Sequence, residues 1–381
     1  MPIKCLKKNW SRFEQMRHIF IKPLAFFLSI TVFCVAYAAP RKVQRGNESW
    51  RALKKAQDAF ADNDFAEAVK LADHAKEIRK QDAEWQTYIL EETLKKSKVR
   101  HAGDEFDRVI PVLHECGMEE AVRIVESHLE KYGADFFNGN YSLMIDFIPF
   151  FSYYPEADFL LGKIYKLEGE YEAALNYLKT AYEHSASLHV PMEKYDLLYE
   201  LAELSFDLGN EDEYEKYLLA VALDDNLFID PSYSRSLKRI VDSDSKDAVE
   251  KFFMLYRYEN ETALKAFMEL TRFYMSKGLT EKALNCSSFA SILIVSKLEN
   301  ALKERLNDFQ YTNFTSFVVA CSQFEDIIDW GNENRVWELF CDFADAAADS
   351  GKIAFADELF AMLSQVEPVE FWQHYAESKV N

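Results

Sequence analysis

Glycine and proline are scarce in this chain, with 11 Gly and nine Pro among 381 residues. Few residues are therefore available to interrupt regular elements or to build tight turns. The chain also lacks any sustained alternation of β-branched and polar residues, the pattern expected of half-buried strands. Short aromatic runs such as Phe150–Tyr154 are typical of core packing between helices. The sequence therefore predicts an all-α protein.

Cysteine is also rare, at six residues. Two of them, Cys5 and Cys34, fall in the first 38 residues, and the other four are Cys116, Cys286, Cys321 and Cys341. No C-x-x-C occurs, and each of the four lies within an apolar helical pattern, where a free thiol behaves as a small hydrophobic group. We expect buried thiols. An oxidising compartment would still permit a disulfide, and Cys321 with Cys341 is the pair to test.

The chain contains none of the common catalytic signatures. There is no phosphate-binding G-x-x-x-x-G-K-[ST], no G-x-S-x-G, no H-E-x-x-H and no G-x-G-x-x-G. His114 with Cys116 and His184 with His189 are the only suggestive metal-ligand pairs, and neither has a second pair at zinc-site spacing. The many carboxylates are typical of a solvated helix face. We therefore predict no catalytic residues, no metal site, no cofactor and no enzymatic activity.

Basic residues are outnumbered, with 44 Lys and Arg against 64 Asp and Glu and a net charge of −20. The first 38 residues hold six of the bases and only one acid, Glu14, so the remainder carries a charge of −25. Nucleic acid and anionic membrane surfaces would repel such a chain. The charge excludes a nucleic-acid-binding function.

The first 38 residues have the order of a secretory signal peptide. A basic start is followed by an apolar run, Leu24–Val35, and by Ala36-Tyr37-Ala38. The run is shorter than the roughly 20 apolar residues that a spanning helix needs. We expect cleavage after Ala38 and export to the periplasm or the bacterial cell envelope. One alternative is a retained membrane anchor, because the basic start is long. A lipid-bearing Cys34 is a third, although Phe33 is bulky for such a site.

A repeated pattern of small, aromatic and glycine residues runs through the rest of the chain. It is clearest in residues 159–182, FLLGKIYKLEGEYEAALNYLKTAY. We expect Gly162 and Ala174 to lie where two antiparallel helices cross, with Tyr165 and Leu178 filling the space on either side. Gly169 would end the first helix at a positive φ, which is cheap for glycine alone. Such a hairpin cannot bury its apolar face alone, so neighbouring hairpins must stack on it.

Further copies of the pattern occur along the chain, and they place Gly209, Gly278 and Gly351 at the same turn. Ala283 and Ala356 occupy the position of Ala174. An N-terminal copy spans residues 56–75, with Asn63 at the turn, and a weaker copy spans residues 109–125. Between the copies we expect extra helices near residues 84–96 and 141–154, and degenerate hairpins at residues 232–256 and 302–328. Roughly seven or eight hairpins result, with a soft boundary near residues 225–234.

This pattern resembles the tetratricopeptide repeat (TPR), and the chain is similar to exported bacterial TPR proteins. The resemblance implies a superhelical solenoid whose first helices line a concave groove. With residues 1–38 as the signal peptide, residues 39–225 and 226–381 would form two continuous arrays. The carried-over groove candidates are Phe159, Lys163, Lys166, Tyr199, Glu203, Phe206, Lys265 and Arg272. The same positions also give Glu156, Asp196, Met268, Met275, Trp50, Leu53, Gln57 and Phe60. No Asn occurs among them, so the carboxylate clamp of chaperone-binding TPR domains is not reproduced.

The mixture of aromatic, Met and charged residues suits a peptide or protein segment. We therefore expect a non-catalytic scaffold that binds a protein partner at the bacterial envelope. The alternative is a ligand-binding accessory subunit of an envelope transporter. Membrane association would then come only from an uncleaved signal or from a partner. The sequence is also compatible with a homo-oligomer. The amphipathic C-terminal tail, residues 369–381, is the expected cap of the last hairpin.

Overall fold

The computed structural model describes residues 40–97, 114, 152–255, 258 and 260–380. Every regular element in these ranges is a helix, which confirms the predicted all-α class. The chain divides into two compact units, residues 1–55 with 73–153 and residues 56–72 with 154–381. None of the helices in the described ranges has the length and hydropathy that a bilayer-spanning segment requires.

The N-terminal hairpin contains α2 (Ser49–Ala61) and α3 (Phe65–Ser97), and residues 56–72, which include its turn, are assigned to the second unit. At this turn Phe60 and Phe65 have their ring centroids 5.8 Å apart. The prediction of a separate helix near residues 84–96 is wrong, because α3 continues through that range without interruption. The physical reason is that no Gly or Pro occurs between Phe65 and Ser97 to end the helix.

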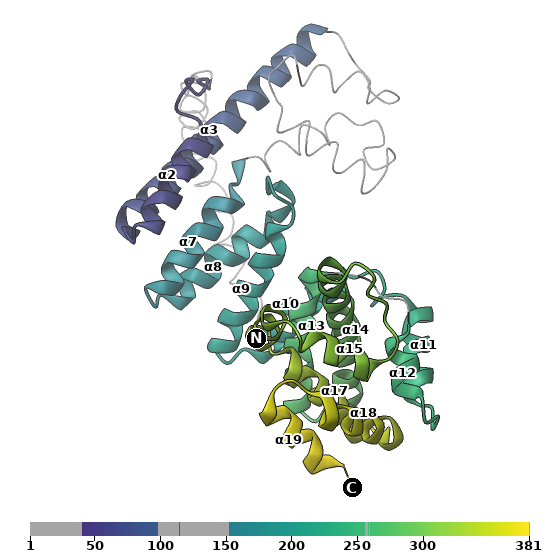
Figure 1. Ribbon diagram of the computed structural model, residues 1–381. Helices are drawn as coiled ribbons and strands as arrows, with labels where there is room; N and C mark the ends of the chain where they lie inside the picture. Colours follow the sequence, from purple (N-terminus) through teal and green to yellow (C-terminus); the bar gives the residue numbers. More distant parts are fainter. Residues whose placement is uncertain (1–39, 98–113, 115–151, 256–257, 259, 381) are drawn as a thin grey trace, which may run out of the picture. The chain divides into compact units, whose positions relative to one another are not determined.

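Four helical hairpins form the framework of residues 154–381 (Figure 1). They are α7 (Pro155–Leu167) with α8 (Tyr171–Glu183), α9 (Glu193–Asp207) with α10 (Glu211–Ala222), α13 (Glu261–Ser276) with α14 (Thr280–Arg305), and α17 (Val336–Asp349) with α18 (Ile353–Val366). Each hairpin packs on the next, through α8 on α9, α10 on α13 and α14 on α17.

Shorter helices complete the unit. They are the 3₁₀ helix η3 (Ser185–Ser187), α11 (Pro231–Val241), α12 (Ala248–Phe253), α15 (Phe314–Cys321), α16 (Glu325–Glu333) and α19 (Glu370–Lys379). α11 packs against α12 where the sequence predicts a degenerate hairpin. For the second degenerate hairpin, predicted at residues 302–328, the predicted start is wrong, because α14 continues to Arg305. The helix predicted near residues 141–154 and the weak copy at residues 109–125 lie almost wholly outside the described residues, as does the leader.

The hairpin turns confirm the predicted role of glycine. Gly169, Gly209, Gly278 and Gly351 all have positive φ, between 65° and 79°. Asn63, at the corresponding turn between α2 and α3, has φ 60°. A left-handed residue lets the chain reverse directly after a helix, and Gly or Asn adopts this conformation at the least steric cost.

The close approach predicted at Gly162 is also present. A Cβ atom at Gly162 would lie 2.6 Å from Cδ2 of Leu178, so a larger residue would force the Leu178 side chain to move. Ala174 and Leu178 are fully buried opposite it. Tyr165 stacks on Tyr177, with ring centroids 5.3 Å apart and parallel planes. α7 and α8 are therefore held at contact distance by small residues on one side and aromatic rings on the other.

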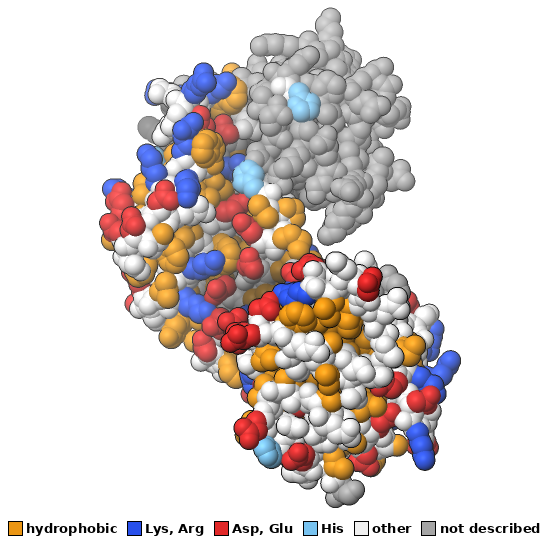
Figure 2. All heavy atoms as spheres, viewed as in Figure 1, with side chains coloured by type: hydrophobic (Ala, Val, Ile, Leu, Met, Phe, Trp, Pro, Cys, Tyr) orange, Lys and Arg blue, Asp and Glu red, His pale blue; other side chains and the backbone are white. Residues whose placement is uncertain are grey.

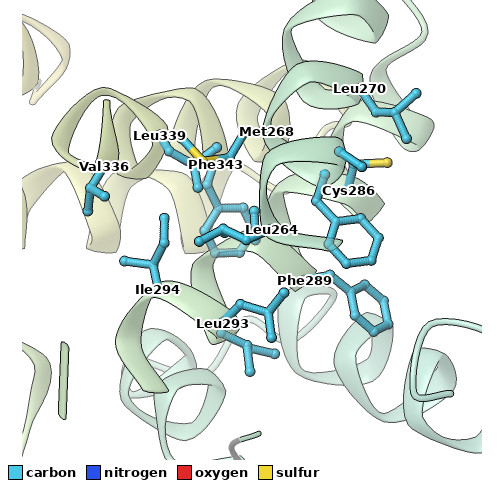
Figure 3. Close-up of a cluster of buried hydrophobic side chains, with 14 of the residues drawn as sticks. Leu264, Met268, Leu270, Cys286, Phe289, Leu293, Ile294, Val336, Leu339 and Phe343 are labelled. Atoms are coloured by element: carbon cyan, nitrogen blue, oxygen red, sulfur yellow. The ribbon is translucent and has the colours of Figure 1, made fainter. Parts of the chain in front are cut away.

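The hydrophobic core includes buried side chains of α13, α14 and α17 such as Leu264, Phe289 and Phe343 (Figure 3). Ala283 and Ala356 are buried in this core. Cys286, Cys321 and Cys341 are buried free thiols, as the apolar pattern predicts, and burial raises the pKa of each. The tested pair, Cys321 with Cys341, forms no disulfide. Cys116 lies outside the described residues.

The side chain of Asp225 forms hydrogen bonds that stabilise the segment in which the sequence predicts a soft boundary. Its buried carboxylate accepts hydrogen bonds from the backbone N–H groups of Leu227 and Phe228, each at 2.9 Å. It also accepts from the Tyr258 hydroxyl at 3.1 Å and from the Asn260 side-chain amide at 2.7 Å. Because Asn260 is the N-cap of α13, one carboxylate links the loop after α10 to the start of α13.

Candidate functional site

Three adjoining hollows form a groove along the first helices of successive hairpins, and we call this surface the groove. The α9 hollow has a volume of about 610 Å³ and is lined mainly by α9 together with Lys163 of α7 and the start of α13. The middle hollow, of about 310 Å³, lies between α9, α10 and α13. The α16 hollow, of about 490 Å³, lies between α13, α14 and α16. Lys265 lines all three. Figure 2 shows side chains of both charge signs around a depression in the face that it draws.

Tyr199 joins α9 to α13 beneath the groove. Its hydroxyl donates a hydrogen bond to the Thr262 carbonyl and accepts one from the Ala266 N–H at 3.0 Å. These two backbone groups are four residues apart and would pair with each other in a regular α-helix. Burial raises the pKa of Tyr199 well above its usual range. The hydroxyl therefore stays protonated and serves as a structural link.

Two lysines of the groove lie over aromatic rings. The Lys265 ammonium is 4.9 Å from the centroid of Tyr199, and the Lys163 ammonium is 3.9 Å from the centroid of Phe159. Both distances fall within the range of a cation–π interaction. These contacts position the two ammonium groups, which keep their positive charge, at the α9 hollow.

Lys166 forms a small ion-pair network with the next hairpin. Its ammonium lies 2.8 Å from Glu200 and 3.1 Å from Glu203. Burial alone would lower the pKa of Lys166, but its hydrogen bonds to the two glutamates outweigh burial and raise it. The lysine therefore remains charged. Through it, α7 is tied to α9 at the edge of the groove.

The middle hollow contains an exposed aromatic ring. Phe206 is 57% exposed there, and its ring lies 5.0 Å from that of Tyr214. The Tyr214 hydroxyl donates to Glu269 of α13 at 3.2 Å, and Glu269 also lines the α16 hollow. An exposed aromatic ring beside hydrogen-bonded polar groups is the kind of surface that protein interfaces use as an anchor.

The α16 hollow is built around arginines. Arg272 forms ion pairs with Glu269 at 3.3 Å, Glu338 at 3.5 Å and Asp342 at 3.8 Å. Arg335, with φ 53°, pairs with both carboxylate oxygens of Glu338 at 2.5 and 2.7 Å. Burial and then repulsion by Glu338 raise the pKa of Asp342 to about 7, because these effects exceed the opposing attraction of Arg272.

The structure brings together six of the eight groove candidates. Lys163, Tyr199, Glu203, Phe206, Lys265 and Arg272 all line one hollow or more. The other two, Phe159 and Lys166, line none of them. Phe159 is only 7% exposed and lies under Lys163, while Lys166 is held in its ion pairs. Whether any of the six contacts a partner stays a prediction.

Sequence reasoning missed Glu193, Trp330 and Arg335, which also line the groove. Glu193 precedes Asp196 by one turn of α9, so helical spacing alone could have found it. Trp330 lies on α16, and Arg335 is the N-cap residue of α17. The repeat pattern is lost in this segment. Within the described ranges, no group of three or more His, Cys, Asp or Glu side chains is placed to hold a metal ion.

Comparison with known proteins gives little about function. No family profile matches the chain. A protein of Treponema pallidum (strain Nichols) is 28% identical over 326 residues, which cover 85% of this chain and 87% of that protein. It is described as uncharacterised. The similarity therefore extends over most of both chains and carries no activity, substrate or partner with it.

Proposed function

We propose that the chain is an exported, non-catalytic scaffold with a TPR-like solenoid architecture, and that the groove binds a segment of a protein partner. The observation that carries this proposal is the continuity of the groove, since Lys265 lines all three hollows. A succession of open hollows fits an extended chain better than it fits one compact small molecule.

Two further features support the proposal. Gly169, Gly209, Gly278 and Gly351 give the turns of four hairpins the same positive-φ conformation, as expected of a stacked repeat. The groove wall combines exposed Phe206 with charged groups of both signs. Aromatic anchors surrounded by polar groups are typical of protein interfaces. The basic leader and apolar run at residues 1–38 support export to the bacterial envelope.

The experiment is a crosslinking pull-down from envelope extract of the organism that encodes the chain. Lys265→Glu reverses a charge in all three hollows, and Lys246→Glu makes the same change at an exposed residue outside the groove. We expect the wild type and Lys246→Glu to recover the same partner and Lys265→Glu to lose it. Equal recovery by both variants, or no specific partner with the wild type, would reject the proposal.

A second candidate is a ligand-binding accessory subunit of an envelope transporter. The α16 hollow favours it, because Trp330 and four cationic side chains surround a volume within the usual range of small-molecule pockets. A thermal-shift screen against a metabolite library separates the two functions. A small ligand that binds tightly raises the melting temperature, whereas a scaffold for peptides shows no shift with metabolites.

A further inference from the structure

The α9 hollow is lined by more carboxylates than lysines. Five carboxylates line it, against Lys163 and Lys265. Three of the five have cationic partners: Glu200 and Glu203 pair with Lys166, and Glu261 pairs with Lys297. The other two, Glu193 and Asp196, form no ion pair with any Lys or Arg in the part of the chain that the structure describes.

Glu193 and Asp196 lie one turn apart on α9, an arrangement in which like charges repel. Burial raises the pKa of Glu193, and repulsion by Glu156 of α7 and by Asp196 raises it further. Lys163 and His189 act in the opposite direction without cancelling the rise. The free protein therefore keeps two crowded carboxylates at this end of the groove, and a cation from outside would relieve their repulsion.

The edge of the same hollow is apolar. Val190 is 50% exposed and Met192 is 56% exposed, and both line the hollow beside the rings of Tyr195 and Tyr199. Lysine and arginine side chains have an aliphatic stem and a cationic head, and they pack the stem on apolar surface while the head stays with polar groups. An apolar rim next to unpaired carboxylates and tyrosine rings matches both parts of such a side chain.

We propose that the α9 hollow takes a lysine or arginine side chain from a basic, extended segment of a partner protein, held by Glu193 and Asp196 with its stem on Val190 and Met192. This inference rests on the proposed function, because it assumes that the groove binds a protein segment. It adds the chemistry of that segment. The large negative charge of the chain would also speed the approach of a basic partner.

The test uses three fluorescein-labelled peptides of about twelve residues, the length of a typical extended docking segment. They repeat Lys-Ser, Gln-Ser and Glu-Ser, and their binding is followed by fluorescence anisotropy at about 150 mM salt. The variants are Glu193→Gln/Asp196→Asn and the matched control Glu168→Gln/Glu172→Gln. The control removes the same charge from two exposed glutamates near the α7–α8 turn that line none of the three hollows.

We expect the Lys-Ser peptide to bind the wild type and the control equally, and the groove variant to bind it about tenfold more weakly. Glu193→Lys should also weaken binding of the Lys-Ser peptide, because it changes the charge of the hollow in the same direction as the groove variant does. Circular dichroism melts establish that each variant is folded. Equal loss of binding in the groove variant and the control, or no preference of the wild type for the Lys-Ser peptide, would overturn the inference.

The inference and the proposed function fail in different ways. If Lys265→Glu abolishes recovery of a protein partner while the Lys-Ser peptide does not bind the wild type, the groove still binds a protein but the basic-segment assignment is wrong. If Lys265→Glu leaves partner recovery unchanged, the proposed function itself is wrong. The peptide and pull-down measurements together therefore assign every outcome to one of the two statements.

Discussion

The ammonium of Lys265 lies 4.9 Å from the ring of Tyr199, and the hydroxyl of that ring bonds to the backbone of the helix that carries Lys265. One aromatic side chain therefore both supports a cation at the centre of the groove and connects α9 to α13. The groove depends on this connection, because the α9 hollow and the middle hollow are both lined by residues of these two helices.

Tyr199→Phe tests the connection. The substitution removes the hydroxyl and leaves Thr262 and Ala266 without that partner, so we expect the unfolding free energy to fall by about 1 kcal/mol. Urea unfolding followed by circular dichroism measures the change. Tyr171→Phe is the control, since Tyr171 is exposed and its hydroxyl makes no hydrogen bond to any residue that the structure describes. Equal stability of the two variants would contradict a structural role for the hydroxyl.

Gly278 tests the requirement for positive φ at the hairpin turns. Its φ is 65° and nothing lies within 4 Å of an added Cβ, so a substitution is limited by backbone strain and not by space. We expect Gly278→Ala to lower stability by about 1 kcal/mol. Gly278→Asn should cost less, because Asn63 already adopts φ 60° at the corresponding turn. The melting temperatures of the two variants measure this difference. An alanine variant as stable as the asparagine variant would be inconsistent with the strain argument.

The sequence predicted the hairpins well because their determinants are local. A small residue at the crossing, such as Gly162, and a glycine at the turn, such as Gly169, act within one hairpin and leave a readable pattern. The lengths of α3 and α14 were not predicted correctly. Both helices are longer than the repeat pattern predicts. The pattern predicts a helix end at positions where the sequence has no Gly or Pro to end the helix.

The groove could be predicted only in part. Tyr199 and Lys265 follow from helical position, since residues on one face of a first helix point to one side. The ion-pair partners could not be predicted from helical position. Glu200 pairs with Lys166, and Glu338 pairs with Arg272, and each glutamate comes from a different hairpin from its partner. The burial of Phe159 did not follow either, because it depends on packing in the core shared by several helices, whereas only its contact with Lys163, four residues further along α7, is local.

Asp342 should make stability depend on pH. Its pKa in the folded protein is about 7, raised by burial and by Glu338, so between about pH 4 and pH 7 the folded chain holds a proton that the unfolded chain has lost. The unfolding free energy should therefore fall as pH rises through this window. Asp342→Asn removes the loss, so its unfolding free energy relative to wild type should be about 4 kcal/mol higher at pH 8 than at pH 4.

Urea unfolding of wild type and variant at pH 4 and pH 8 measures this difference. Asp357→Asn, at an exposed position on α18, is the control and should follow the wild type at both values. If Asp342→Asn had the same stability relative to wild type at the two pH values, the assignment of a raised pKa would be wrong.

Deleting residues 369–381 tests the predicted cap. α19 packs on α17 and α18, and Asp345 of α17 accepts a hydrogen bond from the Tyr375 hydroxyl at 2.5 Å and pairs with Lys379 at 2.7 Å. We expect the truncated chain to expose apolar surface, to melt at a lower temperature and to self-associate in sedimentation. A soluble monomer with an unchanged melting temperature would rule out the capping role.

The central claim is that the groove is the surface that contacts a protein partner, and site-specific photo-crosslinking tests it most directly. A photoreactive phenylalanine replaces Phe206, 57% exposed in the middle hollow, or Ile353, 54% exposed and outside all three hollows. In cells of the organism that encodes the chain, we predict a discrete adduct with one protein at position 206 and none at position 353. The same adducts at both positions, or none at position 206, would contradict the claim.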